Sequence, residues 1–110
     1  MNLEEKTKKN NNYRKVVDTT KTQQLVLMSL PAGEDIPEEV HSKTTQFIKV
    51  EDGEIVVVIN GKKKTLKTGY SIVIPPGAKH YVKAKKLSKL YTIYSPPEHP
   101  VGLTQKTKPH

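Results

Sequence analysis

The 110-residue chain contains no cysteine, no tryptophan and a single phenylalanine. The lack of cysteine excludes a disulfide framework, a thiolate metal site and a cysteine nucleophile, so histidine, carboxylate and amide groups remain as metal ligands. It also fits a reducing compartment, and we expect a cytoplasmic protein. Because the chain has no run of about 18 apolar residues and no apolar stretch near its start, we expect neither a membrane span nor a secretory signal.

The net charge of +8 comes largely from lysines that gather in three places along the chain. These are Lys6, Lys8 and Lys9, then Lys62, Lys63 and Lys64, and finally Lys79, Lys83, Lys85, Lys86 and Lys89. A basic surface can attract nucleic acids. However, few aromatic residues lie between the lysines to stack on bases, and no helix-turn-helix or RNA-binding signature is present. We therefore favour a solvated, lysine-rich surface over a nucleic-acid partner.

A chain of this length forms a single domain with a modest hydrophobic core. Residues 1–12 are polar and include three consecutive asparagines and several lysines, so we expect them to form a flexible tail. The character of the sequence changes at Tyr13, and we assign the folded domain to residues 13–110.

The domain is expected to consist of short β-strands rather than helices. No stretch has the sustained spacing of apolar residues that would predict a substantial helix. Short runs rich in β-branched residues occur instead at residues 24–30, 45–50, 54–59, 62–67, 71–74, 80–83 and 87–95. Asp52-Gly53 and Asn60-Gly61 each predict a hairpin turn. Many short strands at this spacing indicate an all-β barrel or sandwich.

Residues 55–59 are apolar at five consecutive positions. A strand without polar alternation is expected to be buried on both faces. One face would line the barrel, and the other would need a second layer. Because so short a chain has little material for such a layer, we expect a second subunit to supply it and predict a homodimer.

Two patterns of spaced residues stand out in the chain. The first is Gly33-x5-Glu39-x-His41-x4-Gln46-x6-Gly53, and the second is Gly69-x5-Pro75-x-Gly77-x2-His80. Together they resemble the two motifs of the cupin superfamily, G-x5-H-x-H-x3,4-E-x6-G and G-x5-P-x-G-x2-H-x3-N. The resemblance covers about residues 23–95 and implies a cupin-type, jelly-roll-like antiparallel β-barrel.

Three positions depart from the cupin motifs. Glu39 stands in place of the first histidine, Gln46 in place of the glutamate, and Ala84 in place of the final asparagine. More narrowly, the segments YRKVV, QLVLMSL and LYTIYSPPEHPVG make the chain similar to small single-domain cupins of the mannose-6-phosphate isomerase-like group. That resemblance implies a small polar ligand of the sugar or sugar phosphate class. The large phosphomannose isomerases use a Gln-x-His…Glu…His zinc set, which has the same residue types with Glu and Gln exchanged.

The residues themselves also predict a metal site. Glu39 and His41 are two positions apart, so on a strand their side chains point to the same face. The next strand can bring Gln46 alongside, and His80 arrives from a distant strand. Two imidazoles, a carboxylate and an amide oxygen suit a divalent ion such as Zn, Mn, Fe, Ni or Co. A metal-free polar pocket is the alternative interpretation.

The sequence leaves the reaction open. A metal could act as a Lewis acid in an isomerase-like enzyme, and a redox-active metal would permit an oxygen-dependent enzyme. No general base can be named, because Glu39 is already assigned to the metal, and the alternative is a non-catalytic binding module. His99 either covers the barrel mouth or lies near the chain end without a role. We assign no role to His110.

Overall fold

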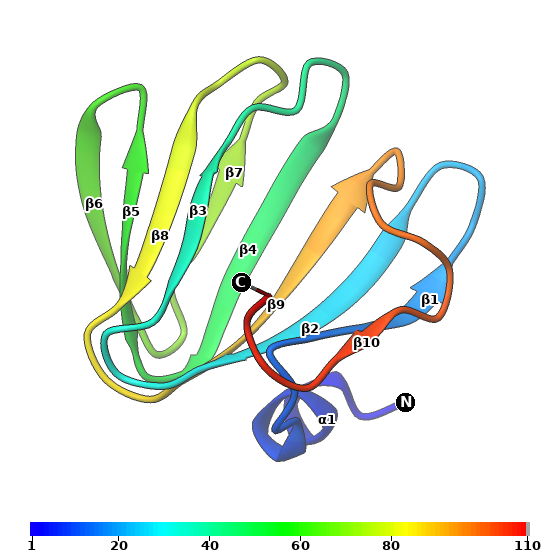
Figure 1. Cartoon of the computed structure of the whole chain (residues 1–110), viewed down its shortest axis with the longest axis horizontal. Coiled ribbons are helices and arrows are strands. Elements are labelled where there is room, and N and C mark those ends of the chain that lie inside the picture. The colour runs from blue at the N-terminus through cyan, green and yellow to red at the C-terminus, as the bar shows by residue number, and fades with distance from the viewer. Residues whose placement is uncertain (110) are drawn as a thin grey trace.

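The computed structural model describes residues 1–109, in which ten strands form two antiparallel sheets that face each other (Figure 1). His110, to which we assigned no role, lies outside the described residues. The six strands of the first sheet are β1 (Arg14–Thr19), β2 (Gln24–Leu30), β4 (Thr45–Asp52), β7 (Ser71–Ile74), β9 (Ser88–Ser95) and β10 (Thr104–Gln105). The four strands of the second sheet are β3 (Asp35–Glu39), β5 (Glu54–Ile59), β6 (Lys62–Lys67) and β8 (His80–Ala84).

The strand orders are β10-β1-β2-β9-β4-β7 in the first sheet and β3-β8-β5-β6 in the second. The prediction of an all-β, jelly-roll-like barrel is confirmed. Residues on the inner faces alternate with residues on the outer faces, so Val26 and Met28 enter the core while Lys15 and Asp18 face solvent. Within residues 1–109, no helix is long and apolar enough to cross a membrane.

The two predicted hairpins have different outcomes. Asn60-Gly61 connects β5 to β6, whose residues pair in sequence from Ile59 with Lys62 onward, as predicted. Asp52-Gly53 does not form a hairpin, because β4 pairs with β7 and β9 whereas β5 belongs to the other sheet. The chain crosses between the sheets at Gly53, where a Cβ atom would lie 2.6 Å from Ser88 Cα. Glycine is therefore needed there for close packing against the start of β9.

The first residues of the chain differ from the expected flexible tail. Leu3–Lys9 form helix α1, which packs against β4 and β9, and Thr7 is fully buried. The side chain of Asn2 caps the helix by accepting a hydrogen bond from the Glu5 amide, 3.0 Å away. Two lysine–glutamate pairs one turn apart add to its stability. The segment LEEKTKK contains a single apolar residue, so it has no apolar periodicity that would predict a helix.

Lys89 fixes the end of α1 to the outer face of the first sheet. Its ammonium group donates hydrogen bonds to Asn10 O, Asn11 Oδ1 and Ser29 Oγ. Burial lowers the pKa of Lys89. This lysine was expected on the solvated surface, and the strand register instead places it under the first residues of the chain.

The apolar run at residues 55–59 is half buried within one chain. Ile55 and Val57 enter the core, whereas Val56 and Val58 on the other face remain partly exposed. The expected burial on both faces is therefore not reached within residues 1–109. A second subunit as the covering layer stays a prediction.

Candidate metal centre

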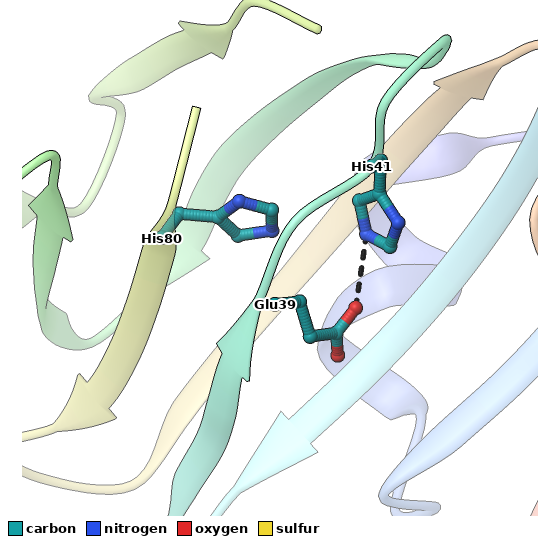
Figure 2. A group of neighbouring side chains, drawn as sticks. All are labelled: Glu39, His41 and His80. Atoms are coloured by element: carbon teal, nitrogen blue, oxygen red, sulfur yellow. Dashed lines mark ion pairs between the residues drawn. The ribbon is translucent and has the colours of Figure 1, made fainter. Parts of the chain in front are cut away.

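Three of the four predicted metal ligands meet where the second sheet ends. Glu39 is the last residue of β3, and its direct partner in the ladder is His80, the first residue of β8. His41 follows Glu39 by two positions and turns to the same side (Figure 2). One ligand atom from each of these residues lies within 4.8 Å of those from the other two. The imidazole rings of His41 and His80 have centroids 5.2 Å apart.

Gln46 lies on the inner face of β4 and is almost fully buried. Its Nε2 donates hydrogen bonds to Thr92 Oγ1 at 3.0 Å and to Tyr94 Oη at 3.3 Å. These two bonds fix the amide orientation and leave Oε1 buried without a hydrogen-bond partner among the described residues. Tyr94 also contacts the His41 ring edge-on, with centroids 5.7 Å apart, and so places Gln46 next to the histidines.

The orientation of His80 is fixed by the backbone. Its Nδ1 lies 3.0 Å from Ala78 O. Because a carbonyl oxygen can only accept, Nδ1 carries the proton of the neutral ring, and Nε2 keeps a free lone pair. A backbone carbonyl that holds the other ring nitrogen is the arrangement commonly found in metal-binding histidines.

His41 stands between two carboxylates. Its Nε2 lies 2.9 Å from Glu39 Oε2 but is buried without an aligned hydrogen bond, and its Nδ1 lies 3.5 Å from Glu98 Oε2. Glu98 also accepts a hydrogen bond from Thr44 Oγ1. The His41 ring can therefore turn one nitrogen to a metal while the other faces Glu98.

The donor set fits a divalent cation. Glu39, His41 and His80 bring one ligand atom each within 4.8 Å of one another, so a cation between them would have three donors. Gln46 Oε1 is buried without a hydrogen-bond partner among residues 1–109. Leaving such an atom unpaired costs about 1–3 kcal/mol.

Glu98 was not found from the sequence, and neither was the side chain that positions it. Gln24 is fully buried at the start of β2. Its Oε1 accepts hydrogen bonds from the backbone amides of Glu98 (3.2 Å) and His99 (3.0 Å), and its Nε2 donates to His99 O at 2.8 Å. Gln24 thus holds residues 98–99 over this end of the barrel. No local signal in the sequence marks this support, because Gln24 reaches residues 98–99 through contacts between distant positions.

His99, whose role the sequence left open, packs inside the barrel mouth. Its ring meets Tyr94 edge-on with centroids 5.1 Å apart, and its Nε2 is buried without a hydrogen-bond partner among the described residues. Burial, together with the charges of Arg14 and His41, lowers the pKa of His99 to about 4. The ring is therefore neutral at pH 7.

The tyrosines point into or out of the barrel as the alternation of side chains along each strand predicts. Tyr94 is buried on the inner face, and burial together with the Glu39 charge raises its pKa, so its hydroxyl stays protonated. Tyr91 faces outward against Phe47. Tyr81 turns away from the metal ligands and donates a hydrogen bond of 2.7 Å to Asp35 Oδ2.

Known proteins share both the sequence and the fold of this chain. The family model of the Cupin domain matches residues 26–94. Uncharacterized protein L612 of Acanthamoeba polyphaga mimivirus is 43% identical over 115 residues, which cover 99% of this chain and 72% of that protein. Uncharacterized protein YrkC of Bacillus subtilis is 38% identical over 116 residues, covering 98% of this chain and 62% of that protein. The chain thus spans less than two thirds of the length of YrkC.

A solved structure supports the same fold. The crystal structure of BH2720 from Bacillus halodurans superposes with a TM-score of 0.94. That protein is 35% identical, and the match covers 96% of this chain and 86% of that chain. The likeness therefore includes nearly all of the β-sandwich that carries Glu39, His41, Gln46 and His80.

Proposed function

Because the chain belongs to the cupin family, we propose that it binds a divalent metal ion inside its barrel and presents this ion to a small polar ligand. The proposed metal ligands are Glu39, His41, Gln46 and His80. The observation that carries the proposal is the convergence of one ligand atom each from Glu39, His41 and His80 within 4.8 Å of one another, together with the buried Gln46 Oε1, which has no hydrogen-bond partner among the described residues.

The donor types limit the identity of the metal. Two imidazoles, one carboxylate and one neutral amide suit Zn, Mn, Fe, Ni or Co and leave coordination positions for water or a ligand. When bound, such an ion supplies Lewis-acid polarisation of a carbonyl or hydroxyl oxygen. The amide of Gln46 is a weaker donor than the usual carboxylate, so we propose moderate affinity.

Glu98 is proposed as a positioning residue for His41. Its carboxylate faces Nδ1 of His41 and accepts a hydrogen bond from Thr44. The backbone amide of Glu98 donates a hydrogen bond to Gln24. A carboxylate behind a metal-bound imidazole fixes the ring orientation and raises its basicity. In this role Glu98 stabilises the metal site without touching the ion.

A sugar or a sugar phosphate is the proposed ligand class, and the resemblance to mannose-6-phosphate isomerase-like cupins supports it. An aldose–ketose isomerisation needs a general base near the substrate carbon. His99 is neutral at pH 7, has an unpaired Nε2 and is not among the proposed metal ligands. It is therefore the group we propose to test as the base, with mannose 6-phosphate and fructose 6-phosphate as substrates.

A non-catalytic binding module is the alternative function. The lowered pKa of His99, about 4, favours it, because an imidazole that binds a proton so weakly is a poor general base at pH 7. Tight binding of a sugar phosphate by the metal-loaded protein, with no interconversion of the two sugar phosphates over hours, would support the module and exclude the isomerase.

The proposed metal site is tested by calorimetric titration of tag-free, metal-stripped protein with Zn, Mn, Ni and Co salts, and with Fe(II) under anaerobic conditions. We expect one ion per chain for the wild type and lost affinity in His80→Ala. A matched control is His99→Ala, which removes an imidazole from the same end of the barrel without removing a proposed ligand. Equal affinity in the wild type and His80→Ala would contradict the site.

We also propose that the outer face of the second sheet joins two copies of the chain. The half-buried Val56 and Val58 lie there beside Tyr81. Light scattering at micromolar concentration should give the mass of a dimer, and a clean monomer would count against this assembly. The lack of cysteine keeps the cytoplasm as the proposed location.

A further inference from the structure

Arg14 is a cation that the strand register directs into the barrel. It pairs with Met28, which belongs to the core, and it is only 7% exposed. The next residue, Lys15, is exposed on the outer face of the same strand. The side chain of Arg14 is therefore withdrawn from water. A cation placed one residue further along β1, at the position of Lys15, would be solvated.

Neighbouring side chains use only part of the hydrogen-bonding capacity of the Arg14 guanidinium. Nη1 donates to Gln105 Oε1 at 2.7 Å, and the group lies 5.2 Å from the centroid of the Tyr13 ring. Nε is buried without a hydrogen-bond partner, and Arg14 forms no ion pair within residues 1–109. A buried charge without an opposite charge is costly, so proteins normally pair it.

Lys108 provides a contrast at the same end of the molecule. Its ammonium group pairs with Asp35, and this partner lowers the pKa of the Asp35 carboxyl. The charge of Lys108 is thus compensated within the chain. Within residues 1–109 the charge of Arg14 has no such partner, although Arg14 is the more deeply buried of the two.

A small cavity lies against Arg14. Its volume is about 200 Å³, and it is lined by Tyr13, Arg14, Pro37, Glu39, Lys108 and Pro109. It thus joins β1 and β3 beneath the C-terminal segment and includes Glu39, one of the proposed metal ligands. Ligand pockets of drug-sized molecules measure roughly 300–1,000 Å³, so this cavity suits a group of only a few atoms.

We infer that Arg14 binds an anionic group, a carboxylate or a phosphate, of the small molecule whose other end reaches the metal. The Nε edge of a guanidinium forms a planar fork that matches either anion with two parallel hydrogen bonds. The cavity leaves room for such an anion and brings it next to Glu39. This inference adds to the proposed function that the ligand is anionic and that Arg14 binds its charged group. It rests on the proposed function for the contact between the ligand and the metal.

The test uses three small probes that differ in charge. Glycolate carries a hydroxyl and a carboxylate, inorganic phosphate carries a phosphate alone, and ethylene glycol is the neutral match of glycolate. Calorimetric titrations are made with metal-free and Ni-loaded protein. The variants are Arg14→Met and Arg14→Lys, and the matched control is Lys15→Met, which removes the same charge one residue away on the outer face.

We expect the wild type to bind at least one of the two anions more tightly than ethylene glycol. Arg14→Met should lower that affinity by roughly 10- to 100-fold, as expected for the loss of charge-assisted hydrogen bonds. Lys15→Met should leave it unchanged, and Arg14→Lys should lower it several-fold, because lysine lacks the fork. Whether glycolate or phosphate loses more distinguishes a carboxylate ligand from a phosphate ligand.

A purely structural Arg14, which serves only to hold Gln105 and β10, predicts another outcome. Gln105→Ala would then change anion affinity as much as Arg14→Lys does, whereas the inference predicts no change. The inference would be overturned by equal anion affinity in Arg14→Lys and the wild type. It would also be overturned if neither the metal-free nor the Ni-loaded wild type bound an anion. Both results can be obtained even if Arg14→Met fails to fold.

The same titrations separate the inference from the proposed function. If nickel binds to the wild type but Arg14→Met keeps full anion affinity, the anion receptor is wrong and the metal site stands. If no metal binds but anion affinity depends on Arg14 in the metal-free protein, the metal site is wrong and the anion receptor stands.

Discussion

The two ends of the barrel interior are equally buried but differ in how their atoms are satisfied. At one end, Met28, Val50 and Leu90 are completely withdrawn from solvent and pack within the hydrophobic core. Arg14, the β1 partner of Met28, is the polar exception in this row, and it lines a cavity together with Glu39. At the other end, Gln24, Tyr94 and Gln46 form a continuous row across β2, β9 and β4. That row lies beside His41 and His99, whose buried Nε2 atoms have no hydrogen-bond partners among the described residues.

This difference separates the residues that stabilise the fold from the residues that bind. Apolar side chains in a closed core lose nothing by burial, whereas unpaired polar atoms lower stability until a ligand satisfies them. We therefore expect substitutions at the apolar end to change the free energy of unfolding and substitutions at the polar end to change metal affinity.

The largest expected effect on stability is at the apolar end. Leu90→Ala should lower the free energy of unfolding of the metal-free protein by about 2–5 kcal/mol, because it leaves a cavity in a fully buried site. Denaturant unfolding measures this loss. Leu87→Ala is the control, since Leu87 is 56% exposed and should change stability by less than about 0.5 kcal/mol. Similar losses in both variants would contradict the division between the two ends.

His80→Ala should show the opposite pattern. Removal of a proposed ligand is expected to lower metal affinity by more than about 100-fold, beyond the usual effect of residues that only support a ligand. The free energy of unfolding without metal should fall by less than in Leu90→Ala. Denaturant curves recorded with and without the metal separate the two quantities. A large loss of stability without metal would instead assign His80 to the core.

Gln46→Leu tests whether the unpaired amide oxygen is kept for a ligand. Leucine removes the buried unsatisfied oxygen at similar volume but also the two hydrogen bonds that Nε2 donates to Thr92 and Tyr94, so the metal-free protein should lose at most about 1–3 kcal/mol. The stabilisation produced by saturating metal should become smaller, and thermal unfolding with and without metal measures it. Equal metal-induced stabilisation in the wild type and the variant would remove Gln46 from the proposed site.

Glu98→Gln should have a smaller effect, because Glu98 faces His41 rather than the ion. We expect metal affinity to fall by roughly 10-fold and the spectrum of bound Co(II) to shift as the His41 ring loses its fixed orientation. Glu38→Gln, at an exposed position, removes the same charge nearby and should leave both unchanged. An unaltered Co(II) spectrum in Glu98→Gln would exclude the positioning role.

The smallest effect concerns pH. Burial and the charges of Arg14 and His41 lower the pKa of His99 to about 4, whereas Glu98 acts in the opposite direction. In the unfolded chain a histidine binds its proton near pH 6.5. As the pH drops, the unfolded state is therefore protonated before the folded state. The free energy of unfolding falls between about pH 6.5 and about pH 4 as a result. His99→Gln should lose less stability than the wild type between pH 7 and pH 4.5. An identical loss, measured by denaturant unfolding without metal, would contradict a buried neutral His99.

The sequence predicted seven of the ten described strands, because their β-branched runs and turn residues are local signals, and it missed β1, β3 and β10. It also predicted that Glu39 and His41 would point to the same side, since side chains two apart share a face, whereas His80 was assigned to the site by the resemblance to the second cupin motif. Asp52-Gly53 misled because a turn dipeptide does not reveal whether the next strand joins the same sheet. α1 was missed because its stability comes from a cap and ion pairs rather than from an apolar stripe.

The supporting residues of the site could not be predicted, again for a physical reason. Arg14 and Gln24 reach it through strand register and long side chains, and Glu98 through a backbone segment held by Gln24. The contacts of Gln24 with Glu98 and His99 join positions more than 70 residues apart. The described β10 was likewise not expected, because it is formed by only Thr104 and Gln105.

Elemental analysis tests the central claim most directly. The wild type and a His41→Ala, His80→Ala double variant would be purified without a histidine tag, supplied with the same divalent metals and desalted. The account predicts about one Zn, Mn, Fe, Ni or Co ion per wild-type chain and none in the double variant. Equal and negligible metal in both proteins would contradict it.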